Sequence, residues 1–333
     1  MTMRVRGFRD GDLEAVLELR SLVFRGLEET RERRRWRWEF EENPFRREDL
    51  PLTWVVEEGE RIVGNFGMVP YAMKIGGAIG RAVDGIDLAV HPACQGRGLA
   101  HLLTDALMDP AGSDFAFVAA PTDATTHLFV QRGGIILGRK GEPLTWTCPL
   151  ESEPTARTRE EIEAAFASIE LLIDFDERFD ELWERLAPGF PLLTVRNRSY
   201  LNWRYRDYPF GKPHLLAASD RDGMLAGFAV VQEDLALSRA YLLELFAAPE
   251  DPATAKRLLL AARKIASRPG LRVLAVVTRL ASMRRLLHES GFSELGEPIP
   301  VYAGKLNGAR ATPSVDEWYV SLGDGDALFS VGR

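Results

Sequence analysis

Residues 83–100 decide the fold, and their sequence is VDGIDLAVHPACQGRGLA. The first eight residues have the apolar pattern of a buried β-strand, from Val83 to Val90. A short loop with Pro92 and a glycine-rich turn follow. Beyond the turn, apolar residues at i, i+3 and i+4 predict a helix over residues 98–107. The sequence therefore predicts a strand that leads through a glycine turn directly into a helix.

The predicted start of this helix suits an anionic ligand. The first turn of a helix presents N–H groups without internal partners and the positive end of the helix dipole. Gly96 and Gly98 let these N–H groups approach a phosphate without a side chain in the way. The chain has no Gly-x4-Gly-Lys-Ser/Thr motif, and His101 stands where the dinucleotide fingerprint needs a small residue. Neither common nucleotide motif fits, so we expect the pyrophosphate of another ligand.

The element order around this stretch occurs twice along the chain. Trp, an aromatic residue, Pro and Phe have identical spacing in both copies, as Trp38, Phe40, Pro44 and Phe45 and as Trp203, Tyr205, Pro209 and Phe210. A hairpin, a buried strand, a helix, a second buried strand and a second helix are predicted after each copy. After the first copy their ranges begin at 53–56 and continue with 83–90, 98–107, 115–119 and 125–131; after the second they are 214–218, 241–247, 255–265, 273–277 and 282–289.

A repeat of this length indicates two duplicated domains. We expect them at residues 1–148 and 149–333, joined by the polar, proline-containing stretch 149–159. Residues 318–322 are predicted to form a last strand. Asp324 and Asp326 follow it, and their Gly-Asp-Gly-Asp context fits a tight turn better than a cation site.

The composition limits the function classes. A net charge of −7 and a pI of about 5.5 argue against a nucleic-acid binder. Cys94 and Cys148 lie in no CxxC or Cys/His ligand spacing, so we expect neither a disulfide framework nor a metal. The N-terminus has no apolar signal region, and no apolar run approaches the ~18 residues that a membrane helix needs. We therefore expect a cytoplasmic protein with no membrane partner.

A basic and aromatic stretch covers residues 31–38. Such a mixture can bind nucleic acid or an anionic sugar. It also fits a helix with a charged outer face whose tryptophans dock on the sheet. The recurrence of Trp38 at Trp203 favours this structural interpretation. The arginines have no counterpart cluster in the second copy, so a substrate role for them stays open.

The stretch 83–100 closely resembles the acyl-CoA site of the GCN5-related N-acetyltransferases, the GNAT superfamily. The family signature is Gln/Arg-x-x-Gly-x-Gly/Ala after a strand that ends in Val-x-Pro. Gln95, Gly98 and Ala100 fill the signature, with Val90 and Pro92 before it. The resemblance covers residues 1–148, and the second half resembles the same fold without the signature because residues 252–257 lack the glycines.

The resemblance implies two tandem GNAT-like domains of the α+β class, with α/β-type layers. Each would have a mixed, mostly antiparallel central sheet flanked by helices. The acyl-CoA site would lie in the first domain only, and the second domain, 149–333, would be a degenerate copy. The co-substrate would be acetyl-CoA or another acyl-CoA, with no metal.

The resemblance also implies which residues bind the co-substrate. The strand residues would splay from their neighbour and pair with the pantetheine arm, and the turn would hold the pyrophosphate by its N–H groups. For Arg97, a bond to a phosphate and a solvated surface position are equally open, and Phe129 would pack against the cofactor. The residues implied in cofactor binding are Leu88, Ala89, Val90, Gln95, Gly96, Arg97, Gly98, Leu99, Ala100 and Phe129.

Acyl transfer to an amine needs a neutral amine, a stabilised oxyanion and a protonated leaving thiolate. In the family a backbone N–H, here near Ala89 or Val90, stabilises the oxyanion, and a carboxylate on the same strand acts as base. Asp84, eleven residues before Gln95, is the first candidate base. By the two-residue strand period it would share a face with Leu88 and Val90.

Asp87 would face the other way and is the competing candidate base. Each aspartate could instead only bond neighbouring backbone groups. The tyrosine that often serves as general acid corresponds to Phe129, which cannot donate a proton. Tyr71 and His127 are possible substitutes, although His127 fits a solvent-facing helix position better.

The sequence therefore predicts an enzyme, an N-acetyltransferase or related N-acyltransferase that moves the acyl group from acyl-CoA to a primary amine of a small molecule. The alternative is a non-catalytic CoA-binding or sensor protein with the same fold. The missing tyrosine at position 129 supports this alternative. Turnover of acetyl-CoA with an amine separates the two.

Overall fold

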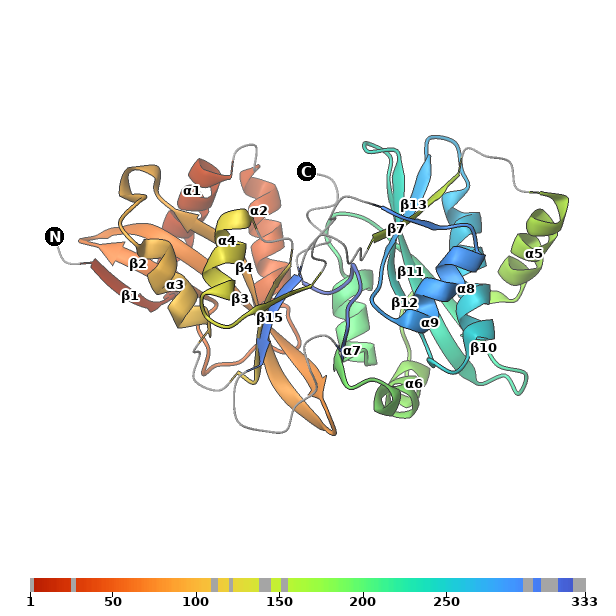
Figure 1. Ribbon diagram of the computed structural model, residues 1–333. Helices are drawn as coiled ribbons and strands as arrows, with labels where there is room; N and C mark the ends of the chain where they lie inside the picture. Colours follow the sequence, from red (N-terminus) through yellow and green to blue (C-terminus); the bar gives the residue numbers. More distant parts are fainter. Residues whose placement is uncertain are drawn as a thin grey trace. The chain divides into compact units, whose positions relative to one another are not determined.

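The computed structural model describes residues 3–24, 28–108, 113–119, 122–137, 145–150, 155–295, 302–306 and 317–325. The chain divides into two compact units (Figure 1). The first consists of Met1–Met73, Ala78–Ile136 and Tyr302–Val315, and the second of Lys74–Gly77, Leu137–Val301 and Asp316–Arg333. None of the described helices has the length and apolarity needed to cross a bilayer.

The first unit is built on a mixed sheet. Its strands, in spatial order, are β1 (Met3–Gly7), β2 (Thr53–Glu58), β3 (Arg61–Ile75), β4 (Ala78–Val90), β5 (Phe115–Ala119), β15 (Tyr302–Leu306) and β6 (Ile135–Leu137). β1, β2 and β3 pair antiparallel, β4 pairs parallel with β5, and β15 pairs antiparallel with β5. The predicted α+β class with a mixed, mostly antiparallel sheet is confirmed.

Helices cover both faces of this sheet (Figure 1). α3 packs on one face through Leu99, Leu103 and Leu107, each no more than 2 % exposed. Their spacing of four residues places them on one side of the helix, as the sequence pattern predicts. The helical segments are η1 (Asp10–Asp12), α1 (Leu13–Val23), α2 (Glu29–Trp36), η2 (Arg37–Glu41), η3 (Pro92–Cys94), α3 (Leu99–Met108) and α4 (Asp123–Val130).

The second unit has a sheet of the same kind. Its strands, in spatial order, are β14 (Ser293–Glu294), β7 (Thr145–Pro149), β13 (Val273–Val277), β12 (Arg239–Ala247), β11 (Leu225–Asp234), β10 (His214–Ser219) and β8 (Ile169–Leu172). Only β12 and β13 pair parallel along this path. β9 (Leu192–Thr194) and β16 (Trp318–Tyr319) pair parallel with each other. The helical segments are α5 (Ala156–Ala167), α6 (Arg178–Leu186), η4 (Ala187–Gly189), α7 (Arg198–Leu201), η5 (Asn202–Arg206), α8 (Pro252–Ala266) and α9 (Ala281–Glu289).

Each unit contains chain from both sides of residue 148. β7 precedes that residue for most of its length, yet it pairs with β13 in the second sheet. β15 comes from near the C-terminus, yet it pairs with β5 in the first sheet. The units therefore exchange a strand, which a single cut between residues 148 and 149 does not describe.

The repeated tryptophan motif is a core feature. It forms a π-helical segment in both units, η2 and η5, and Trp38 and Trp203 are buried there. At the chain's end, the strand predicted over 318–322 is present only as β16, and Asp326 lies outside the described residues.

Candidate functional site

The first sheet opens at the end of β4. β4 and β5 are paired only from Ala82 to Asp84 on β4, although β4 continues to Val90 and β5 to Ala119. Beyond Asp84, the described residues of β5 offer β4 no further pairing. The implied splay is therefore present, and within the described part of the chain it leaves one backbone edge of β4 without a pairing strand beyond Asp84.

A bulge lies inside this open segment. Asp87 has a φ of +51°, and among the described non-glycine residues only Ser238 shares a positive φ. A left-handed residue within a strand interrupts the two-residue alternation of side chains. Val83 before the bulge and Leu88 and Val90 after it all pack with the α3 core.

The alternation break overturns one expectation about faces. Because Val83 faces α3, its neighbour Asp84 faces the opposite side. Asp84 therefore does not share a face with Leu88 and Val90. Asp87 faces the same side of the sheet as Asp84, because it pairs there with Arg20 of α1 and Arg35 of α2. The extra residue of the bulge resets the strand period between the two aspartates.

The backbone of β4 presents Val90 to the open edge. The N–H of His91 donates to the carbonyl of Val63 on β3 at 2.9 Å. Successive N–H groups of a strand point to opposite edges, so the Val90 N–H points away from β3 and into the splay. Of the two candidate oxyanion donors, the geometry therefore favours Val90 over Ala89.

The glycine turn has the predicted form. Gly96 and Gly98 have φ values of +75° and +78°, and a Cβ atom added at either would meet nothing within 4 Å. α3 begins immediately after, at Leu99. The backbone amides of residues 96–98 donate no hydrogen bond to any described residue. The turn thus exposes bare N–H groups at a helix N-terminus, which is a favourable site for an anion.

Arg97 lies beside the turn and already has a partner. Its Nη2 donates to Oε1 of Glu58 at 2.9 Å, and its side chain is 43 % exposed. The Arg97 guanidinium lowers the pKa of Glu58 through this hydrogen bond. Gln95 donates to the carbonyl of Val90 at 3.4 Å, so its side chain links the turn to the end of β4.

Asp84 and Tyr71 are both buried in the sheet interior and both neighbour Phe117. Asp84 is 1 % exposed and stands in register with Phe117 of β5. The Phe117 ring lies 5.6 Å from the ring of Tyr71, which is 3 % exposed. His127 is exposed on α4, with Nε2 2.8 Å from the Gln131 side-chain nitrogen.

Phe129 is fully buried in the core against α3. Leu88 and Val90 at the end of β4 pack against the same core. Gln95 links the turn to Val90, so the structure brings the end of β4 and the turn together.

A buried ionic cluster surrounds Asp87, and sequence reasoning missed it. Arg20 contacts both Asp87 and Glu32, while Arg35 contacts Asp87 at 3.0 Å and Glu39 at 2.9 Å. The five side chains are at most 4 % exposed. Burial raises the pKa of Glu39 to about 7. The available signal was the i,i+4 pair of Arg35 and Glu39 on an otherwise solvent-facing basic helix.

The basic stretch 31–38 is largely neutralised by its neighbours. Arg33 pairs with Glu14 and Glu29, and Arg37 pairs with Glu42 at 2.7 Å. Together with the buried Arg35, three of the arginines are engaged within the first unit. This supports the structural interpretation of a helix with a charged outer face.

The second unit fills the corresponding space with its own chain. β12 pairs with β13 only from Arg239 to Leu242, although β12 runs on to Ala247. Gly323 N–H donates to the Leu243 carbonyl at 2.8 Å, and Tyr319 Oη donates to the Leu245 carbonyl at 2.7 Å. The chain near residue 320 therefore occupies the open edge of β12.

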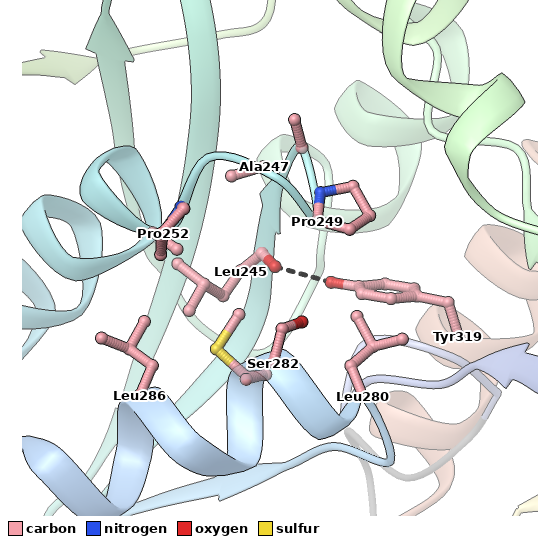
Figure 2. A pocket seen from close by; sticks show the side chains of 11 residues that line it. Leu245, Ala247, Pro249, Pro252, Leu280, Ser282, Leu286 and Tyr319 are labelled. Carbon is pink, nitrogen blue, oxygen red and sulfur yellow. Dashed lines mark hydrogen bonds between the residues drawn. The ribbon is translucent and has the colours of Figure 1, made fainter.

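The start of α8 is closed in the same way. The carboxylate of Asp251 accepts a hydrogen bond from the Thr254 N–H at 3.1 Å, at the place where a bound anion would sit. A small apolar pocket, with a volume of about 20 Å³, remains beside Tyr319. Figure 2 shows it between the α8 start at Pro252 and the side chains of Leu280 and Leu286.

Comparisons with known proteins agree with this geometry. The family model described as "Acetyltransferase (GNAT) domain" matches residues 4–120. A comparison with curated proteins found no match. Among solved structures, the chain is similar to a GCN5-related N-acetyltransferase from Anabaena variabilis, with 12 % identity, a TM-score of 0.65, and coverage of 92 % of this chain and 73 % of that one.

Two further solved structures cover most of both chains. A putative acetyltransferase from Pyrococcus horikoshii has 15 % identity and a TM-score of 0.56, with coverage of 95 % of this chain and 92 % of that one. Saccharomyces cerevisiae N-myristoyltransferase with bound myristoyl-CoA has 14 % identity and a TM-score of 0.54, with coverage of 91 % and 78 %. At these identities the likeness establishes the fold, and the family match establishes the domain. Residues 4–120 of this chain therefore match the GNAT acetyltransferase domain, and the chain shares its fold with solved GCN5-related N-acetyltransferases.

Proposed function

We propose that the protein is an acyl-CoA-dependent N-acyltransferase that moves an acetyl group from acetyl-CoA to a primary amine of a small molecule. The observation that carries the proposal is the open backbone edge of β4, which ends at a turn of bare N–H groups. An extended amide-containing arm followed by a pyrophosphate matches this pair of features in both shape and charge.

Each part of the co-substrate has a partner in the first unit. The backbone from Leu88 to Val90 would pair with the amides of the pantetheine arm. The N–H groups from Gly96 to Ala100 would hold the pyrophosphate at the start of α3. Arg97 is engaged by Glu58, so the backbone would contribute more to phosphate binding than this side chain does.

The chemistry follows from the same geometry. The neutral amine attacks the thioester carbonyl, and the Val90 N–H stabilises the oxyanion that forms. A C–N bond forms, the C–S bond breaks, and the amine proton passes to Asp84, directly or through water. The leaving thiolate takes its proton from solvent or from Tyr71, because the side chain of Phe129 cannot donate one.

A non-catalytic CoA-binding or sensor protein is the second candidate. It is favoured by Phe129, which fills the position of the family's tyrosine and is fully buried. Such a protein would bind acetyl-CoA at the same turn but would not consume it.

Acyl transfer with a panel of primary amines separates these candidates. The full chain is incubated with acetyl-CoA and with amino sugars, amino acids, polyamines or aminoglycosides, and the release of free thiol is followed. We expect release that depends on one class of amine, with the N-acetylated product identified by mass spectrometry. Asp84→Asn should slow turnover and leave acetyl-CoA binding intact. Binding without turnover for every amine would favour the sensor, and absence of binding would contradict both.

A further inference from the structure

Building on the acyl-CoA site proposed above, we infer that Asp87 is a positioning residue and not the catalytic base. Its carboxylate, held by Arg20 and Arg35, fixes the bulge that opens β4 to the acyl-CoA.

The backbone conformation of the bulge needs stabilising contacts. A residue with a Cβ atom disfavours the left-handed conformation that Asp87 adopts, with φ of +51°. Arg20 from α1 and Arg35 from α2 grip its carboxylate, and Asn65 of β3 donates to its carbonyl at 3.2 Å. The side chain and the backbone of the bulge are therefore held by three separate elements of the first unit.

The same contacts leave the Asp87 carboxylate no room to act on a substrate. Oδ2 receives Arg20 and Arg35, and Oδ1 lies 3.3 Å from Nη1 of Arg35. A base must come within hydrogen-bond reach of the proton that it removes. Guanidinium groups occupy that space around Asp87.

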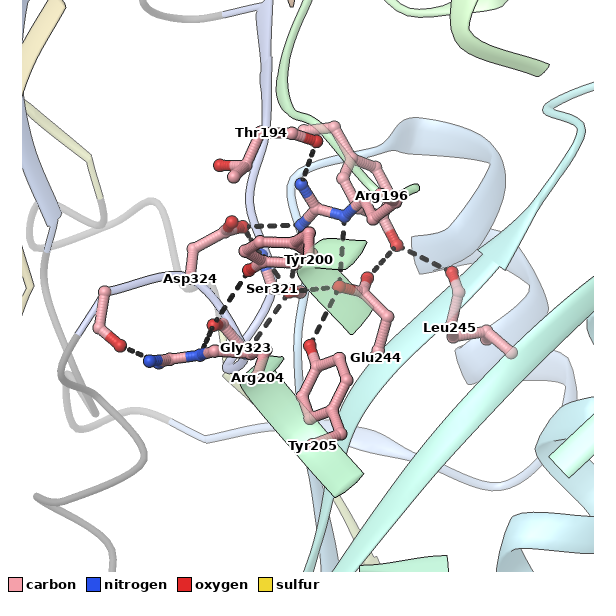
Figure 3. Close-up of polar contacts among 12 residues, drawn as sticks. Thr194, Arg196, Tyr200, Arg204, Tyr205, Glu244, Leu245, Ser321, Gly323 and Asp324 are labelled. Atoms are coloured by element: carbon pink, nitrogen blue, oxygen red, sulfur yellow. Dashed lines mark hydrogen bonds and ion pairs between the residues drawn. The ribbon is translucent and has the colours of Figure 1, made fainter. Parts of the chain in front are cut away.

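The second unit contains a related arrangement, in which the carboxylate residue does not have a positive φ. Glu244 lies three residues before the end of β12, as Asp87 does in β4. A bulge adjoins it, because Val230 pairs with Glu244 while Val231 pairs with Leu242. Figure 3 shows the fully buried Glu244 with Arg196, whose Nε lies 3.1 Å from its carboxylate.

The presence of a held carboxylate in both units distinguishes a positioning role from a catalytic role. In the second unit no glycine stands between β12 and α8, and Tyr319 and Gly323 fill the open edge of β12. It nevertheless keeps a carboxylate held by an arginine at the bulge. A group that recurs where the turn is missing serves the shape of the strand, and we assign the same role to Asp87.

Asp87→Asn tests the assignment, because asparagine keeps the size and tolerates the left-handed conformation but loses both ion pairs. We expect the Kd for acetyl-CoA to rise about tenfold to a hundredfold, as for a small misplacement of a site, with a fall in kcat. The apparent pKa in the pH profile of kcat/KM should not move. An unchanged Kd together with loss of the acidic limb of that profile would identify Asp87 as the base and overturn the inference.

Two further measurements keep the test decisive. Glu244→Gln is the matched control, because it removes the corresponding charge in the second unit and should leave the acetyl-CoA Kd unchanged. Hydrogen exchange of the ligand-free protein reports on the strand itself. We expect the peptide 85–91 to exchange faster in Asp87→Asn, with no change in the peptide 242–248.

We call the hold of Arg20 and Arg35 on the Asp87 carboxylate the clamp. These readouts test the clamp separately from the proposed acyltransferase function. If the unmodified chain binds no acetyl-CoA but exchange in Asp87→Asn increases, the proposed function fails and the clamp stands. Unchanged exchange over 85–91 overturns the clamp whatever the enzyme assay shows. Arg35→Lys, which keeps the charge but loses the planar fork, should weaken acetyl-CoA binding in the same direction if Asp87→Asn does not fold.

Discussion

Replacing Gly98 by alanine separates backbone strain from ligand binding. The φ of Gly98 is +78°, and an added Cβ meets nothing within 4 Å, so no clash opposes the change. The left-handed conformation alone should cost about 1 kcal/mol of unfolding free energy. The methyl group would also project into the open space in front of the bare N–H groups. We expect the Kd for acetyl-CoA to rise at least about tenfold, or ~1.4 kcal/mol.

Gly223→Ala is the matched control for this prediction. Gly223 has a φ of +81°, also with nothing within 4 Å, and lies in the turn between β10 and β11. Urea unfolding should give both variants a similar loss of stability, and calorimetry with acetyl-CoA should single out Gly98→Ala. Equal affinities in Gly98→Ala and the unmodified chain, despite equal destabilisation, would refute the assignment of the turn to the pyrophosphate.

Three further predictions concern the two cores. Because burial raises the pKa of Glu39 to about 7, the folded state holds a proton that the unfolded chain releases above its lower pKa. The stabilisation from this bound proton is largest at acidic pH and falls as the pH rises to 7. In urea unfolding, the free energy of unfolding of the unmodified chain relative to Glu39→Gln should drop by roughly 3 kcal/mol between pH 4 and 8. A difference that stays constant with pH would be contrary evidence. Tyr319→Phe removes a hydroxyl that contacts Glu244 at 2.8 Å and should cost about 1–3 kcal/mol in chemical denaturation, with the acetyl-CoA Kd unchanged; a changed Kd would count against a site confined to the first unit. Leu103→Ala, at a fully buried position of α3, should cost about 2–5 kcal/mol by the same method, and a cost near zero would show that α3 does not pack there.

The sequence was sufficient to predict the strand, the turn and the helix of the site. Leu99, Leu103 and Leu107 carry the helical period themselves, and Gly96 and Gly98 mark the turn by residue type alone. These signals are local, because they depend on the conformational preferences of the residues themselves and not on distant partners. The repeat also predicted matching elements in the second unit.

The bulge at Asp87 lay beyond such reasoning. Its partners Arg20 and Arg35 are 67 and 52 residues away in the chain, so no local pattern announces the break in strand alternation. The sequence pattern does not reveal the extra residue of the bulge. The prediction for Asp84 therefore placed its side chain on the wrong face of the strand. The exchange of β7 and β15 is hidden for a similar reason, since a strand has the same apolar pattern whichever sheet it joins.

Calorimetric titration of the full chain with acetyl-CoA tests the central claim most directly. Saturable heat at one molecule per chain is predicted, because the turn at Gly98 is open while Asp251 and Tyr319 fill the equivalent places of the second unit. No heat at any concentration, or two equivalent sites per chain, would contradict the account.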